Sequence, residues 1–261
     1  MLKVFTKLID KNPNIDYCIG TTINEYDIKR AHPTALYFVS GKDTYDKLMS
    51  MDKLECNILI GKMMKSDPSL YPKIEERLLY FMNTFCESNN VDERNFISST
   101  RDSILMVNKK PIRTEFENGL VRFRNKEGEY TTYIRIGHYE VLFDSMSGNL
   151  RIKGIDDAYL VGNPVFVKLF KQMLMILELS KTTPMPECLR KISQIRDKYM
   201  NSKDPRMYAS LMRGNRYEYV VDGEKMESEV YLDEKPGVEL IRYSNFIEFI
   251  LPLIRIYFRP H

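Results

Sequence analysis

Residues 95–107 read Asn95-Phe96-Ile97-Ser98-Ser99-Thr100-Arg101-Asp102-Ser103-Ile104-Leu105-Met106-Val107. Two short apolar runs that favour β structure flank a polar centre, so the stretch predicts a β-hairpin with Asp102 at its turn. Residues 72–87, just before it, repeat apolar side chains at helical spacing, and Pro72 suits a first helical turn. The centre of the fold is therefore predicted to be a long helix followed by a hairpin.

A second polar site lies near the N-terminus, where residues 24–28 are predicted to form a strand. Asp27 stands near its end, and a short basic turn follows. Pro33 disfavours helix at His32 and suits a helix start just after the strand. Asp27 and Asp102 thus each lie where a β-prone stretch meets a polar turn with basic neighbours. On adjacent strands, two such carboxylates can hold a pair of Mg²⁺ ions, which clamp the attacking and leaving oxygens of a phosphoryl displacement.

The rest of the chain predicts an α+β fold. Residues 112–155 alternate apolar and polar side chains, with turns expected at Asn118-Gly119, Glu127-Gly128 and Ser147-Gly148-Asn149. After Pro164 the period becomes helical. Short helices are expected at 44–51 and 54–64, further helices at 165–179, 189–200, 207–212 and 244–258, and a hairpin from 217–221 and 230–232. The fold class is an antiparallel sheet with packed helices, followed by a mainly helical region that starts near residue 160.

Composition restricts the setting and the partners of the chain. Its 261 residues suffice for one large domain or two small ones, and the formal net charge of +3 requires any nucleic-acid surface to be local. The four cysteines show no paired spacing, so a reduced cytoplasm is expected, which for a viral chain is that of the host. No run approaches the roughly 20 apolar residues of a membrane span, and no signal peptide is visible.

Four short motifs occur in an order that resembles family B DNA polymerases. The run from Asp27 to Thr34 resembles motif A of that family, an aspartate followed after a few residues by Tyr-Pro-Ser. Lys53-Leu54-Glu55-Cys56-Asn57-Ile58-Leu59-Ile60-Gly61 resembles motif B, Lys-x-x-x-Asn-Ser-x-Tyr-Gly, and Thr100-Arg101-Asp102-Ser103 resembles motif C, Asp-Thr-Asp-Ser. Leu150-Arg151-Ile152-Lys153-Gly154-Ile155-Asp156 resembles the Lys-Gly-Ile-Glu segment that ends the palm. The resemblance covers residues 20 to about 165.

The resemblance implies a domain organisation and a set of site residues. A palm-like domain would occupy residues 1–160, with a minimal fingers segment at about 41–65, and a thumb-like region would occupy residues 161–261. Asp27 and Asp102 would be the catalytic residues and the ligands of Mg²⁺. The incoming nucleoside triphosphate would meet Lys53, Asn57, Lys29 and His32. Nucleic acid would meet Arg122, Arg124, Tyr139 and Lys153.

Several positions depart from the family's pattern. Thr100 replaces the first aspartate of motif C, whereas the second, which the family uses as its essential ligand, is present as Asp102. His32 replaces the tyrosine that, in the family, discriminates against the ribose 2′-hydroxyl. Motif B lacks its serine and its tyrosine, and residues 41–52 leave little room for the family's two long finger helices.

Three functions remain open at this point. The first is a miniature polymerase that uses two Mg²⁺ ions to add nucleotides to a primer 3′-hydroxyl, with primer-template or single-stranded nucleic acid and a replication protein as partners. The second is a non-catalytic relative that binds nucleic acid or a protein partner. The third is a primase-like or template-independent nucleotidyltransferase, which His32 and the short fingers favour. Asp27 and Asp102 also have a plainer interpretation as turn or cap residues, and the basic residues as an ordinary solvated face.

Overall fold

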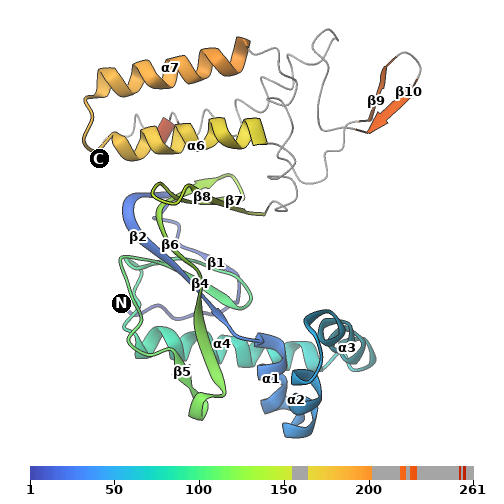
Figure 1. Ribbon diagram of the computed structural model, residues 1–261. Helices are drawn as coiled ribbons and strands as arrows, with labels where there is room; N and C mark the ends of the chain where they lie inside the picture. Colours follow the sequence, from blue (N-terminus) through green and yellow to red (C-terminus); the bar gives the residue numbers. More distant parts are fainter. Residues whose placement is uncertain (155–163, 202–217, 222–223, 228–252, 254, 257–261) are drawn as a thin grey trace. The chain divides into compact units, whose positions relative to one another are not determined.

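The chain forms two compact units, Met1–Ile15 with Thr22–Glu129, and Asp16–Thr21 with Tyr130–His261. The computed structural model describes residues 1–154, 164–201, 218–221, 224–227, 253 and 255–256 (Figure 1). Its antiparallel strands and packed helices confirm the predicted α+β class. The units divide between Glu129 and Tyr130. The sequence pattern predicts a boundary further along the chain, near residue 160.

The first unit is built on an antiparallel hairpin that lies between two strands from the N-terminal part of the chain. Strand β3 (Phe96–Ser99) and strand β4 (Ser103–Val107) form the predicted hairpin, and β4 pairs antiparallel with β2 (Tyr17–Ile28). The strand order is β1 (Asp10–Lys11), β3, β4, β2, β6 (Val121–Ile136), with β5 (Glu115–Phe116) beside β6. Both β2 and β6 continue into the second unit.

Four helices complete the first unit. They are α1 (Ala31–Ser40), α2 (Lys42–Met49), α3 (Lys53–Ser66) and α4 (Leu70–Ser88), so the predicted long helix and both predicted short helices are present. Asp52 caps α3 by accepting hydrogen bonds from the backbone N–H groups of Leu54 and Glu55. The buried face of α4 packs on the sheet, and its Phe85 ring stacks on Phe123 at a centroid distance of 4.2 Å.

Two of the predicted turns differ from the structure. Asn118-Gly119 lies in a short 3₁₀ segment (Glu117–Gly119) within a loop that connects the paired residues Phe116 and Val121, so the loop is longer than a two-residue hairpin. The turn predicted at Glu127-Gly128 is wrong, because β6 runs through it. Gly128 adopts a φ of 88° there and donates its N–H to the Asn125 side chain, a local irregularity that glycine tolerates within a strand.

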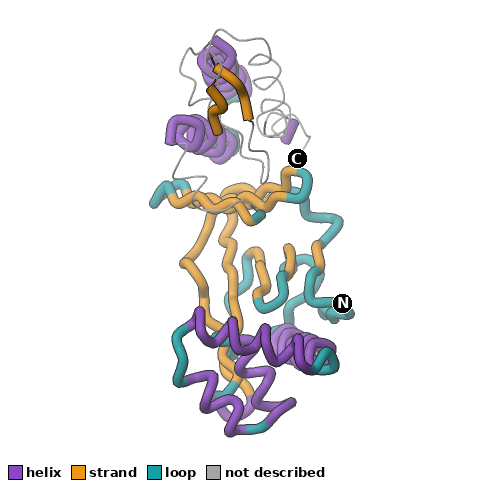
Figure 2. Tube along the Cα trace, turned by 90° about the vertical axis from the view of Figure 1, so that its right-hand side faces the viewer, coloured by secondary structure: helices purple, strands orange, loops and turns teal. Residues whose placement is uncertain are grey.

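The second unit combines the end of β6 with a hairpin and two helices. Strands β7 (Tyr139–Asp144) and β8 (Asn149–Lys153) follow antiparallel, and the turn predicted at Ser147-Gly148-Asn149 joins them. Helices α6 (Pro164–Leu179) and α7 (Met185–Asn201) lie side by side and share a buried core with the strands (Figure 1, Figure 2). None of the helices in the described part of the chain is long and apolar enough to cross a membrane.

The last described elements are a separate pair of strands. Strand β9 (Glu218–Val221) pairs with β10 (Glu224–Glu227), so the partner strand precedes the predicted 230–232 segment, which lies outside the described residues. The helix predicted at 207–212 and most of the one predicted at 244–258 also lie outside them.

Candidate functional site

Asp27 and Asp102 lie at the ends of neighbouring antiparallel strands, as predicted. Asp27 is the register partner of Ser103, and the backbone N–H of Ile28 donates to the carbonyl oxygen of Asp102 at 2.8 Å. The N–H of Thr100 donates to the carbonyl oxygen of Ser103 at 3.0 Å, so Arg101 and Asp102 form a two-residue turn between β3 and β4. The strand pairing thus places both acidic residues at one edge of the sheet.

The acidic side chains lie on the sheet face that α4 does not cover. The neighbours Tyr26 and Ile28 belong to the apolar core that α4 builds with Ile104. Because successive side chains of a strand point to opposite faces, Glu25 and Asp27 point away from that core. Helix α4 therefore covers the face of the sheet opposite to the one that carries Glu25 and Asp27.

A buried chain of hydroxyl groups fixes the turn that carries Asp102. The Ser103 hydroxyl donates to Glu25 Oε1 at 2.8 Å, and Glu25 is buried. The hydroxyl oxygens of Thr100 and Ser103 lie 2.6 Å apart. Since the single hydroxyl hydrogen of Ser103 is given to Glu25, Thr100 donates the bond that joins the two hydroxyls. Glu25 therefore holds both ends of the turn around Asp102.

The turn after Asp27 is held by its own backbone contacts. Lys29 donates its N–H to the Arg122 carbonyl oxygen at 2.8 Å, which ties the turn to β6. Arg30 adopts a left-handed conformation with φ 52° and ψ 51° just before α1. Its guanidinium donates to the carbonyl oxygens of Leu48 and Met51 at 3.4 and 3.1 Å, so it connects the start of α1 to the α2–α3 turn. Arg30 has a structural role here.

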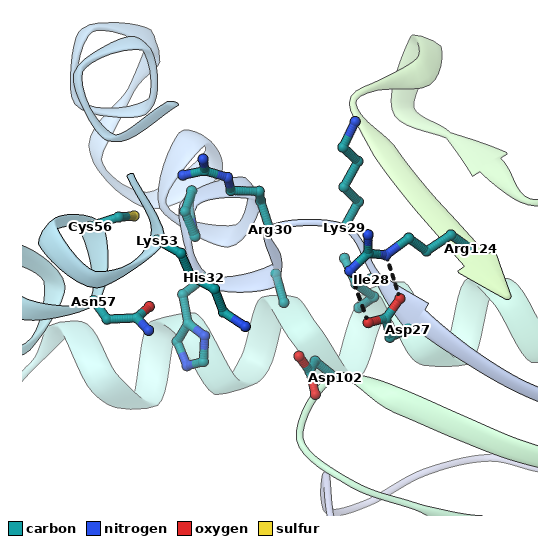
Figure 3. A pocket seen from close by; sticks show the side chains of 12 residues that line it. Asp27, Ile28, Lys29, Arg30, His32, Lys53, Cys56, Asn57, Asp102 and Arg124 are labelled. Atoms are coloured by element: carbon teal, nitrogen blue, oxygen red, sulfur yellow. Dashed lines mark hydrogen bonds and ion pairs between the residues drawn. The ribbon is translucent and has the colours of Figure 1, made fainter. Parts of the chain in front are cut away.

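A cavity of about 370 Å³ joins these two turns to helix α3. Figure 3 shows Lys53 and Asn57 of α3 with His32 of α1 on one side of it, and Asp27 with Arg124 on the other. The lining carries two carboxylates and four basic side chains. It consists of Asp27, Ile28, Lys29, Arg30, Ala31, His32, Pro33, Lys53, Cys56, Asn57, Asp102 and Arg124. A cavity that contains both carboxylates and basic side chains suits a phosphate ligand bound together with a metal cation.

His32 is a neutral imidazole in this setting. Burial lowers its pKa from the usual value of 6.5, the Asp102 carboxylate opposes that shift, and Arg101 adds to it. The imidazole therefore lies within electrostatic reach of Asp102. Both belong to the cavity lining, which brings together residues from α1 and from the β3–β4 turn.

Asp27 forms an ion pair with Arg124 of β6. The Arg124 Nε lies 2.9 Å from Asp27 Oδ1 and its Nη2 lies 3.4 Å from Oδ2, so the guanidinium engages both carboxylate oxygens. The Asp27 side chain is only 10% exposed, whereas that of Arg124 is 62% exposed. The ion pair raises the pKa of Arg124. Sequence reasoning assigned Arg124 to nucleic acid and missed this contact.

The donor chemistry of the two aspartates suits magnesium. Mg²⁺ usually takes one or two protein carboxylates and leaves its other positions to water and substrate phosphates. Asp27 and Asp102 supply two carboxylates at one cavity, and the described residues contain no group of three or more acidic, histidine or cysteine ligands. The residues therefore fit an ion that shares its coordination with a phosphate, provided that Arg124 leaves Asp27.

Of the residues predicted to contact nucleic acid, Tyr139 is buried in the second unit and Lys153 is partly buried there. The Tyr139 side chain is 3% exposed and belongs to the apolar core of that unit. Lys153 is the register partner of Glu140, its side chain is 13% exposed, and its Nζ lies 3.9 Å from Glu140 Oε2. Tyr139 therefore offers almost no surface to a ligand, and the Lys153 side chain offers only a little. Arg122 is exposed but donates to the Gly119 carbonyl oxygen at 2.8 Å.

Comparison with known proteins places the chain in a phage family. No curated protein matches it. A family described as Bacteriophage PBS1 gene 130 protein matches residues 1–259, which is nearly the whole chain. The chain therefore belongs to the Bacteriophage PBS1 gene 130 protein family.

Proposed function

We propose that the chain is a nucleotidyltransferase that binds a nucleoside triphosphate in the cavity between α3 and the carboxylate edge of the sheet. One observation carries the proposal. Asp27 and Asp102 occupy the ends of adjacent antiparallel strands and line a single cavity with Lys29, Lys53 and Arg124. Carboxylates for divalent ions beside cations for phosphates are the groups that phosphoryl transfer requires.

Each lining residue has a distinct role in this proposal. Asp27 and Asp102 would hold Mg²⁺, and the bound ion would supply positive charge that stabilises a transferring phosphate. Lys53, at the first turn of α3, and Lys29 meet the triphosphate as point charges. Asn57 lies one helical turn after Lys53 and can donate to a phosphate or a sugar. His32, whose pKa burial lowers, would face the nucleotide from the same cavity.

The arrangement of elements supports the resemblance to a family B polymerase palm. Helix α4 covers one face of the sheet, the motif C-like turn follows it, and the motif A-like turn lies on the adjacent strand. In this proposal helices α2 and α3 would serve as the fingers, and α3 carries the motif B-like lysine. Primer-template or single-stranded nucleic acid and a replication protein are the proposed partners, in the cytoplasm of the host.

A primer-extension assay tests this function. The full chain is incubated with Mg²⁺, a labelled primer and deoxy- or ribonucleotides, with and without template. Metal-dependent extension that Asp27→Asn and Asp102→Asn both abolish supports a nucleotidyltransferase. Dependence on the template distinguishes a polymerase from a template-independent nucleotidyltransferase. Dependence on a primer distinguishes a polymerase from a primase. No incorporation under any of these conditions would contradict the catalytic proposal.

A second candidate function is a non-catalytic relative that binds a nucleotide or nucleic acid. The observation that favours it is the ion pair of Asp27, both of whose carboxylate oxygens already have a cationic partner in Arg124. Thr100, which replaces an aspartate of the motif C pattern, also favours the non-catalytic function. Nucleotide binding that is independent of Mg²⁺, together with no incorporation, would favour this function over the first.

A further inference from the structure

Arg124 covers the metal-binding side of Asp27. Its planar guanidinium lies over the carboxylate and reaches both oxygens, at 2.9 and 3.4 Å (Figure 3). The buried partner is Asp27 and the exposed partner is Arg124, so the arginine stands between the carboxylate and solvent. A divalent ion that binds Asp27 from the cavity must therefore compete with this guanidinium for the same oxygens.

The ion pair between Arg124 and Asp27 can be broken at low cost in free energy. An ion pair with a mostly exposed arginine contributes little to stability, because water solvates the guanidinium equally well when it is released. The guanidinium of Arg124 donates its hydrogen bonds to Asp27. Arg30, in contrast, is held by two backbone carbonyl groups and cannot leave without disturbing the α2–α3 turn. Arg124 is thus a basic residue of the cavity that is both paired with a carboxylate and mostly exposed.

We infer that Arg124 is an exchangeable counter-ion that occupies the metal's place on Asp27 and moves to a phosphate of the nucleotide when the metal binds. The inference rests on the proposed function and adds a regulatory step to the same cavity. A guanidinium matches the oxygens of a phosphate in the same forked geometry as those of a carboxylate, so Arg124 loses one anionic partner and gains another. Without nucleotide the site binds the metal ion weakly. The metal ion and the nucleotide therefore bind cooperatively.

Metal titration of the full chain tests this inference. Mn²⁺ binding is measured by electron paramagnetic resonance, alone and with a non-hydrolysable nucleoside triphosphate. Arg124→Gln removes the competing cation and is expected to raise the Mn²⁺ affinity about three- to tenfold in the absence of nucleotide. The same variant is expected to bind the nucleotide about tenfold more weakly at saturating Mn²⁺, because a charged hydrogen bond to phosphate is lost.

A matched control separates the guanidinium contact from the general loss of a positive charge. Lys126 is exposed and lies two residues further along β6. Lys126→Gln removes the same charge from the same strand, and both affinities are expected to stay within twofold of the wild type. Arg124→Lys keeps the charge but not the fork, and it should raise the Mn²⁺ affinity less than Arg124→Gln does. Equal Mn²⁺ affinity in wild type, Arg124→Gln and Lys126→Gln would overturn the inference.

The movement itself has a spectroscopic signature. The ¹⁵N-resolved Nε–H resonance of Arg124, identified by its loss in Arg124→Lys, is expected to shift on addition of Mg²⁺ and to shift again on addition of the nucleotide. A resonance that does not respond to Mg²⁺ would show that Arg124 stays on Asp27. The Asp27→Asn variant keeps this test apart from the proposed function. If Asp27→Asn abolishes Mn²⁺ binding but the Arg124 resonance of the wild type does not respond to Mg²⁺, only the exchange is refuted. If Asp27→Asn and Asp102→Asn both leave Mn²⁺ binding intact, the metal site is refuted as well.

Discussion

The backbone N–H of Ile28 donates to the carbonyl oxygen of Asp102 at 2.8 Å, and this bond joins the two polar strand ends of the first unit. It fixes the end of β2 against the turn between β3 and β4. Asp27 precedes the donor and Asp102 carries the acceptor, so both side chains reach the same cavity from backbone that the sheet holds rigidly. Side chains that a hydrogen-bonded sheet positions in this way are placed more accurately than side chains on long loops.

The first prediction concerns the roles of the two aspartates. If the proposed function holds, Asp27→Asn and Asp102→Asn should each lower nucleotide incorporation by about a hundredfold or more, because an amide would replace a charged metal ligand worth several kcal/mol of transition-state stabilisation. Thr100→Ala should cost far less, since its hydroxyl only supports the turn. Single-turnover primer extension measures the rates, and circular dichroism checks the fold. Wild-type turnover in Asp102→Asn would contradict the assigned role.

The second prediction concerns the turn that carries Asp102. Ser103→Ala leaves the buried Glu25 carboxylate without one of its donors and breaks the link to Thr100. A buried polar group that loses a partner costs about 1–3 kcal/mol of unfolding free energy. Urea denaturation should show a lower midpoint for Ser103→Ala. The exposed Ser50→Ala is the control, and its effect should stay within about 0.5 kcal/mol. Equal midpoints would show that this hydroxyl chain does not hold the turn.

Local patterns in the sequence were sufficient for most elements of the first unit. Helix α4 has an apolar stripe at helical spacing, and the β3–β4 hairpin has two apolar runs around a polar turn. Both signals lie within a few residues of the chain. Gly128 was ambiguous because glycine serves equally in a turn and in an irregular strand, and the pairing of β6 decides between them.

The site was predictable only in part, because some contacts depend on distant pairing. The polar turns at Asp27 and Asp102 are visible in the sequence, and Glu25 could have been added because it shares the face of Asp27. The Arg124 contact depends on β6 lying beside β2, for which the sequence has no local signal. The burial of Tyr139 was not predictable, because alternation separates two faces of a strand without saying which face is covered.

The third prediction concerns the pH dependence of stability. Burial lowers the pKa of His32 below the 6.5 of the unfolded chain, so between these two values the unfolded state binds more protons. Stability contributed by the neutral imidazole is therefore present above pH 6.5 and is lost as the pH falls through the folded pKa. Thermal unfolding from pH 7.5 to 5.0 should show a smaller drop in melting temperature for His32→Gln than for the wild type. Parallel curves for the two proteins would contradict the shifted histidine.

The fourth prediction concerns the group that meets the triphosphate. Lys53 lies at the first turn of α3 and lines the cavity, whereas Lys62 lies on the same helix, is exposed and does not line it. Lys53→Gln should weaken binding of a nucleoside triphosphate about tenfold, because a charged contact to phosphate contributes about 1.5–3 kcal/mol. Lys62→Gln should change it less than twofold. Binding of the corresponding monophosphate should change little in either variant, since Lys53 is placed against the outer phosphates. Calorimetric titration with both nucleotides measures these affinities, and equal losses for the mono- and triphosphate would place Lys53 against the nucleoside instead.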